Sequence, residues 1–163
     1  MKKMLMIVAM AVCVFGFSAC GGSDDDEPEK KTFTINGEWM TIVPLTNGGM
    51  LVEFDNLSGN TVKILSYTVS GSRVIENNSL VASRVTDIKK EQTEGTFIYE
   101  PEKVSLTYIL GDKQVFGFVS IYDYEEFVWT VGLTTNIDMI RANSKTNALK
   151  SQLEQEYQAK YAK

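Results

Sequence analysis

The sequence predicts an all-β fold: an antiparallel up-and-down β-barrel of about eight strands, followed by a C-terminal α-helix. Three observations support this prediction. Between residues 38 and 134, apolar residues recur mostly at every second position, in runs of strand length. Turn-forming residues such as Asn47-Gly48-Gly49 and Ser58-Gly59-Asn60 separate these runs. Only the last part of the chain, residues 144–163, changes to a helical period.

The first two expected strands have alternating faces. Residues 38–45 place Trp39 and Val43 on one face, and residues 50–55 alternate apolar side chains at 50, 52 and 54 with Leu51, Glu53 and Asp55. This alternation predicts one buried face and one wet face. We therefore expect the carboxylates of Glu53 and Asp55 on a charged outer face, although two such groups across a cleft would also suit acid–base chemistry.

The remaining strands are expected at residues 61–69, 80–87, 95–100, 104–110, 113–122 and 127–134, with a brief stretch at 73–76 before Asn77-Asn78 and a hydrophilic loop at 89–94. Strands joined by such short connections favour an antiparallel meander, and eight of them can close so that no edge is left unpaired. A β-sandwich of two sheets is the alternative, because turn spacing does not distinguish closure from stacking.

The C-terminal segment, residues 143–163, is expected to be an amphipathic helix. Asn143 or Ser144 can cap its start. An apolar stripe at a spacing of four consists of Leu149, Leu153, Tyr157 and Tyr161. This stripe indicates either a helix docked on the barrel wall or a helix that presents tyrosines to a partner.

The N-terminus has the features of a secretory signal peptide, residues 1–19. Lys2 and Lys3 precede an apolar run from Met4 to Phe17, which is short for a permanent membrane-spanning helix. The following Phe17-Ser18-Ala19-Cys20 resembles the lipobox of bacterial lipoproteins. The resemblance implies that Cys20 becomes the first residue of the mature chain and carries acyl chains such as palmitate, which would anchor it to a membrane. An ordinary secretory signal with a free Cys20 is the alternative.

Residues 20–31 follow as an acidic tether without apolar residues, and we expect this segment to be disordered. Its run of residues 23–27, Ser-Asp-Asp-Asp-Glu, resembles the export signal of Bacteroidetes-type lipoproteins that reach the cell surface. The resemblance implies an outer-membrane, surface-exposed location. A plain spacer, with the protein on the periplasmic face, is the alternative.

The composition excludes several kinds of chemistry. Loss of the signal leaves 14 of the 16 basic residues against 21 acidic ones, a formal charge of −7, which argues against nucleic acid as a partner. Cys13 leaves with the signal and Cys20 is expected to be lipidated, so no disulfide or thiol ligand remains. The chain also has no histidine, the commonest general base. We expect no cofactor, no metal site, no catalytic residue and no enzymatic activity.

A family resemblance begins at Gly37-Glu38-Trp39, which is similar to the glycine-x-tryptophan signature of lipocalins and their short bacterial relatives. In that family the tryptophan closes the base of the barrel, often under an arginine that follows the last strand. The resemblance implies these roles for Gly37, Trp39 and Arg141. The family's threonine-aspartate-tyrosine element has only a loose counterpart in Tyr122-Asp123-Tyr124, and the barrel portion, residues 32–142, is shorter than in full-length lipocalins.

Aromatic residues alternate along the later strands and are the candidates for lining a ligand cavity. They are Phe97, Tyr99, Tyr108, Phe116, Phe118 and Trp129, with Phe127 beside them. Pockets for small apolar ligands are built in this way, and so are filled cores.

Together these features predict a membrane-anchored lipoprotein whose lipocalin-like domain binds a small hydrophobic ligand or a macromolecular partner without catalysis. The alternative is a structural or interaction module of the cell envelope with a solid barrel core, which would dock an envelope protein through its loops or helix.

Overall fold

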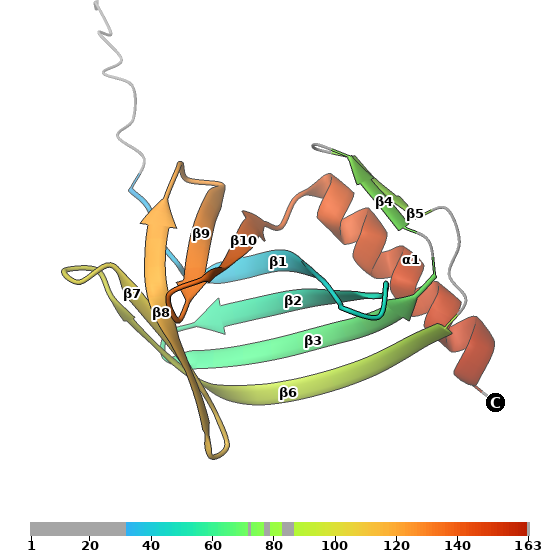
Figure 1. Ribbon diagram of the computed structural model, residues 1–163, viewed down its shortest axis with the longest axis horizontal. Helices are drawn as coiled ribbons and strands as arrows, with labels where there is room; N and C mark the ends of the chain where they lie inside the picture. The colour runs from blue at the N-terminus through green and yellow to red at the C-terminus, as the bar shows by residue number, and fades with distance from the viewer. Residues whose placement is uncertain (1–31, 72, 77–78, 83–86, 163) are drawn as a thin grey trace, which may run out of the picture. The chain divides into compact units, whose positions relative to one another are not determined.

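The computed structural model describes residues 32–71, 73–76, 79–82 and 87–162 (Figure 1). The expected signal peptide, Cys20, the tether and the turn at Asn77-Asn78 lie outside the described residues. The described part of the chain contains ten strands and one helix. They are β1 (Gly37–Pro44), β2 (Met50–Ser58), β3 (Thr61–Ser70), β4 (Arg73–Glu76), β5 (Ser79–Ala82), β6 (Asp87–Glu100), β7 (Ser105–Leu110), β8 (Lys113–Ile121), β9 (Glu126–Val131), β10 (Thr135–Arg141) and α1 (Ser144–Tyr161).

Eight strands form a closed antiparallel barrel in the order β1-β10-β9-β8-β7-β6-β3-β2, which confirms the predicted fold class. The barrel closes where β1 pairs with β10, with Trp39 opposite Arg141 and Met40 opposite Ile140. This pairing excludes the β-sandwich. Within the described residues, no helix is both long and apolar enough to cross a lipid bilayer.

Two strand assignments from the sequence are wrong. Residues 89–94 were expected to be a loop, but they belong to β6 and pair with β3 over Asp87–Thr96. In this stretch Lys89 and residues 91–94 are exposed, and only Lys90 is half-buried. Because neither face carries apolar residues, the sequence of this stretch resembles that of a loop. The expected strand at 80–87 does not join the barrel: its residues 80–82 belong to β5, which pairs with β4 in a separate hairpin.

The sequence also missed β10, because residues 135–141 were placed after the last strand. Along β10 only Met139 is fully buried, so the apolar alternation is weak. Its pairing partners are β9 and β1, which makes it the strand that closes the barrel.

The strands differ in length, and this divides the barrel into two parts. β1 pairs with β2 from Gly37 to Pro44, but among the described residues it pairs with β10 only at Trp39 and Met40. β6 likewise pairs with β7 only from Thr96 onward. The sheet β1-β2-β3-β6 therefore continues past the shorter strands β7–β10, as the long strands in Figure 1 show.

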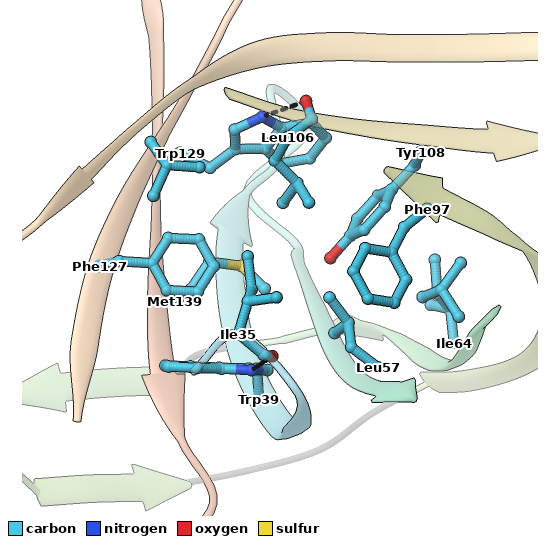
Figure 2. Packing of buried hydrophobic residues seen from close by; sticks show 12 residues of the cluster. Ile35, Trp39, Leu57, Ile64, Phe97, Leu106, Tyr108, Phe127, Trp129 and Met139 are labelled. Carbon is cyan, nitrogen blue, oxygen red and sulfur yellow. Dashed lines mark hydrogen bonds between the residues drawn. The ribbon is translucent and has the colours of Figure 1, made fainter. Parts of the chain in front are cut away.

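A buried cluster fills the part of the barrel where all eight strands meet (Figure 2). Its fully buried members are Ile35, Trp39, Leu57, Val62, Ile64, Phe97, Leu106, Tyr108, Val119, Phe127, Trp129 and Met139. Aromatic rings meet edge to face within it, for example Trp39 and Phe127 at a centroid distance of 4.7 Å.

A second buried cluster lies between α1 and the outer face of the sheet. Leu149 and Leu153 of the helix pack there against side chains that include Phe54 and Tyr67. Asn143 begins the helix as its N-cap, since its side chain accepts the amide N–H groups of Lys145 and Thr146. The helix is thus docked on the barrel wall. Tyr157 is half-buried in the same cluster, and Tyr161 is exposed.

Candidate binding site in the barrel interior

The base of the barrel is closed by Trp39 and Arg141. The indole is fully buried and donates through Nε1 to the carbonyl of Ile35, at 2.7 Å. The Arg141 guanidinium lies over the ring, with Cζ 4.2 Å from its centroid. Gly37 has a φ of +130°, and a Cβ there would lie 3.0 Å from Arg141 Nη1. Gly37, Trp39 and Arg141 therefore lie in contact with one another at this end of the barrel.

Arg141 also joins two backbone segments at this end, the one before β1 and the turn between β8 and β9. Its side chain donates to the carbonyls of Thr34 (2.7 Å), Asn36 (3.2 Å) and Tyr124 (3.0 Å). Glu125 approaches the guanidinium Nε at 3.8 Å. Since the segment before β1 carries Phe33 and Ile35 into the cluster, Arg141 holds that segment as a plug across the base.

Four of the six aromatic residues expected to line a cavity face the interior. Phe97, Tyr108 and Trp129 are buried in the barrel cluster, and Tyr99 is partly buried against it. The Trp129 indole stacks edge-on against Tyr108 at 4.8 Å and donates to the carbonyl of Leu106 (Figure 2). At this end of the barrel these rings form a filled core.

Phe116 and Phe118 do not face the interior, so that part of the prediction is wrong. Each is 47% exposed, and the two rings lie 5.5 Å apart on the outer face of β8. The inward positions of β8 are instead held by Gly117 and Val119. A Cβ at position 117 would lie 2.7 Å from the Trp129 indole nitrogen, so glycine there makes room for the indole. The sequence prediction reversed the inward and outward faces of β8, because the larger apolar side chains of this strand are on its outer face.

The interior contains a buried carboxyl group that the sequence reasoning assigned to the outer face. Asp55 is 1% exposed, and its Oδ2 accepts a 2.8 Å hydrogen bond from the Tyr108 hydroxyl. The register explains the placement, because Asp55 pairs with Trp39 and lies two residues from the buried Leu57 on the same inward face of β2. The opposite face of β2, with Val52 and Phe54, is covered by α1. Both faces of this strand are therefore covered.

The pKa of Asp55 is raised to about 7. Burial is the main cause, the neighbouring Glu53 carboxyl adds to it, and the hydrogen bond from Tyr108 opposes it. Burial also raises the pKa of Glu53, which faces the interior two residues before Asp55. The pKa of Tyr108 is raised as well, by burial and by the carboxyl it contacts.

Polar residues surround the two carboxyl groups on the inward face of β1, β2 and β3. Thr41 pairs with Glu53, and Glu53 pairs with Ser66. We call Thr41, Glu53, Asp55 and Ser66 the polar floor. Thr41 is 2% exposed, whereas Glu53 and Ser66 are half-buried, so burial decreases from the filled cluster toward the open end of the long strands.

Asp123, in the loose counterpart of the threonine-aspartate-tyrosine element, has a structural role. Asp123 Oδ1 accepts the amide N–H groups of Glu125 and Glu126, which fixes the turn between β8 and β9. Among the described residues there is no group of three or more acidic, cysteine or histidine side chains placed to hold a metal ion. The polar floor, with only two carboxyl groups, is a poor donor set for a divalent cation.

The fold and the site define a small closed antiparallel barrel with a filled base, an acidic interior and one helix packed on its outside. Comparisons with protein-family models, with curated proteins and with solved structures give no match for this chain.

Proposed function

We propose that this protein is a lipid-anchored, non-catalytic binding protein of the lipocalin-like type, which holds a small ligand on the polar floor of its barrel. The observation that carries the proposal is the buried Asp55 carboxyl at the boundary between the filled cluster and the open part of the sheet. A barrel that needed only a solid core would gain stability from an apolar residue there, because a buried, partly satisfied acid is unfavourable. Buried acids with strongly raised pKa values are concentrated at functional sites.

The place of the ligand follows from the burial of the inward side chains. The base is filled as far as Trp129 and Tyr108, so a ligand would lie beyond them, where the long strands continue. There the inward side chains Val43, Leu51 and Thr68 are half-buried. These residues replace the aromatic set that the sequence suggested, and they combine apolar surface with a few polar groups, as small-ligand sites do.

A binding role without catalysis is supported by the chemistry of the interior. The chain has no histidine, and its mature form has no cysteine besides Cys20. The buried acid is engaged by a tyrosine hydroxyl, which is itself a poor proton donor because its pKa is raised. The polar floor can therefore orient and hold a molecule.

The membrane anchor rests on the sequence at Cys20, as do the outer-membrane location and surface exposure, with the periplasmic face as the alternative. A Cys20→Ala chain should leave the membrane fraction, whereas the matched Cys13→Ala chain, changed only within the expected signal, should remain in it. Membrane attachment of both variants would contradict the anchor.

The ligand itself is tested by native mass spectrometry of the full-length protein, extracted from its own membranes in mild detergent. We expect a mass increment from a non-covalent small molecule that is lost on denaturation and is absent from an Asp55→Asn chain. Wild-type protein with only its own mass and that of its acyl chains would contradict the proposal.

A second candidate function has its own observation, the exposed apolar patch formed by Ile98, Phe116 and Phe118. These side chains are 47–49% exposed on the outer faces of β6 and β8, on either side of β7. Exposed aromatic side chains on one face are typical of contacts with another protein. This patch favours the interaction-module alternative, with an envelope protein as the partner.

A photo-crosslinking amino acid at position 118, introduced in living cells, tests that alternative. It should give one discrete adduct, and the same group at the exposed outer position 63 should give none. Absence of an adduct from position 118 would remove the second candidate.

A further inference from the structure

Two buried oxygen atoms on the polar floor have no hydrogen-bond partner within the described protein. They are Oδ1 of Asp55 and Oγ1 of Thr41. Buried polar atoms are almost always paired, since an unpaired one loses its hydration without compensation. Each oxygen can accept a hydrogen bond, so a donor group placed between them would pair both.

The two unpartnered oxygens belong to neighbouring residues. Trp39 pairs with Asp55 and Thr41 pairs with Glu53, so Thr41 and Asp55 occupy diagonal positions on the same inward face of β1 and β2. Glu53 lies directly opposite Thr41 on that face. A group placed among the three side chains would meet two carboxyl groups and one hydroxyl.

The charge of this group is unbalanced. The charge that acts on Asp55 is that of Glu53, which is also acidic. The lysines on the helix side of the sheet are engaged elsewhere: Lys90 pairs with Glu154 and Lys150 with Glu38. Arg141 is bound to backbone carbonyls at the base. On the inward face of β6, Glu91 lies opposite Ser66 in the row of Glu53, and Lys89 lies opposite Thr68 in the next row. A positively charged ligand at Thr41, Glu53 and Asp55 would neutralise the carboxyl groups there.

The geometry also restricts the kind of cation. A divalent metal ion requires six or more oxygen ligands or a carboxylate cluster larger than this one. A primary ammonium group carries three N–H donors on one nitrogen, which matches three acceptor side chains. Val43 and Leu51 pair with each other in the next inward row, toward the open end, and offer half-buried apolar surface to whatever follows the nitrogen.

We propose that Thr41, Glu53 and Asp55 bind the primary ammonium group of a small ligand, whose apolar part lies along Val43 and Leu51. This inference rests on the proposed function and deepens it by naming the chemical class of the ligand. The ammonium nitrogen donates to Asp55 Oδ1, Thr41 Oγ1 and the Glu53 carboxylate, while Tyr108 keeps its hydrogen bond to Asp55 Oδ2.

The test is isothermal titration of the full-length protein in detergent with three probes of equal chain length: hexylammonium, hexanol and hexanoate. We expect saturable binding of hexylammonium and at least tenfold weaker binding of the other two. Asp55→Asn retains the shape and an oxygen acceptor for Tyr108, and it should weaken hexylammonium binding about 10- to 100-fold, the range for loss of a charge-assisted hydrogen bond. Thr41→Val should weaken it less.

One control separates charge at the site from charge in general. Glu94→Gln removes an exposed carboxylate on the outer face of β6, which pairs with Lys63, and it should leave hexylammonium affinity unchanged. Equal weakening by Glu94→Gln and Asp55→Asn would overturn the proposal, because it would show nonspecific attraction to an acidic protein.

The remaining outcomes are equally decisive. Hexanol binding as tightly as hexylammonium would overturn the ammonium site while leaving the small-ligand function in place. No saturable binding of hexylammonium would overturn it as well, and the native mass of the extracted protein would then decide separately whether the barrel binds a ligand of another class. Hexylammonium affinity that is unchanged in Asp55→Asn would show that the polar floor is not the site.

Discussion

The Tyr108 hydroxyl on β7 donates a 2.8 Å hydrogen bond to Asp55 on β2, two strands that are separated in the barrel by β6 and β3. The bond therefore crosses the interior, and both residues are buried. It marks the boundary between the filled base of the barrel and the polar floor.

Removing this donor should destabilise the protein. Tyr108→Phe leaves the Asp55 carboxyl without its protein partner, which costs about 1–3 kcal/mol of unfolding free energy. Urea unfolding followed by tryptophan fluorescence measures the change. Tyr99→Phe is the matched control, since Tyr99 is on the same inward face and burial raises its pKa, and the substitution should cost less than about 0.5 kcal/mol. Equal effects of the two substitutions would contradict the role of the crossing bond.

Stability should depend on pH through Asp55, with a definite sign. Burial raises the pKa of this carboxyl from an ordinary value of 3.8 to about 7 in the folded protein. The folded state therefore holds the proton over a range in which the unfolded chain has lost it. The stabilisation is fully present below about pH 4 and is lost as pH rises to about 7, by up to about 4 kcal/mol.

The Asp55→Asn variant isolates this dependence. Glu53 faces the same site and its raised pKa acts in the same direction, while Tyr108 stays protonated throughout. Glu154, whose pKa is lowered to about 2 by hydrogen bonds from Gln158, Lys90 and Tyr67, acts in the opposite direction at acidic pH. All three remain in the variant, so the difference between the two urea-unfolding profiles reports Asp55. If the wild-type and Asp55→Asn stabilities change in parallel between pH 4 and 8, the pKa of Asp55 is not raised in the folded protein, and this prediction is contradicted.

Arg141 should be important for stability although it lies at the end of the barrel. Arg141→Met removes the cation over Trp39 and the donors to three backbone carbonyls, and should cost about 2–4 kcal/mol. Arg141→Lys keeps the charge without the fork of donors and should recover less than half of the loss. Thermal unfolding is the measurement, with Lys63→Met, from an exposed ion pair, as the neutral control. Full recovery by lysine would show that charge alone matters.

Gly117 should not tolerate a side chain. A Cβ at this position would lie 2.1 Å from the Thr130 carbonyl oxygen and 2.7 Å from the Trp129 indole nitrogen. Gly117→Ala should therefore cost 1–3 kcal/mol or more and shift the fluorescence of Trp129. Ser120→Ala, an exposed outer position of the same strand, should change neither. Unaltered stability of Gly117→Ala would show that β8 and β9 are further apart than described.

Much of the fold could be predicted because local patterns report it directly. Alternation and turn residues located β1, β2, β3 and β7, and the stripe with Leu149 and Leu153 located the helix. β6 could not be predicted in full. Before Thr96 it pairs only with β3, and residues 91–94 are exposed on both faces, so apolar residues do not alternate there. β10 was missed because its burial depends on β1, its neighbour in space, and not on its own sequence.

The candidate site was harder to predict for a related reason. A strand covered on both sides has no wet face, so Glu53 and Asp55 looked like surface residues when they faced the interior. The inward face of β8 was predicted wrongly because Gly117 has no side chain, and the space beside it is occupied by the indole of Trp129 on β9. The pairing of Asp55 with Trp39 could have shown that Asp55 faces the interior, but using it requires knowing the register of the first hairpin.

The most direct measurement of the central claim is the titration of the Asp55 side-chain carboxyl carbon by NMR, with and without saturating hexylammonium. We predict a midpoint near pH 7 without the amine, as burial implies, and a midpoint lower by about 1–3 pH units when an ammonium group binds beside the carboxylate. Hexanol should leave the midpoint in place. An Asp55 titration that hexylammonium does not change would contradict the claim that the barrel interior binds a cationic ligand.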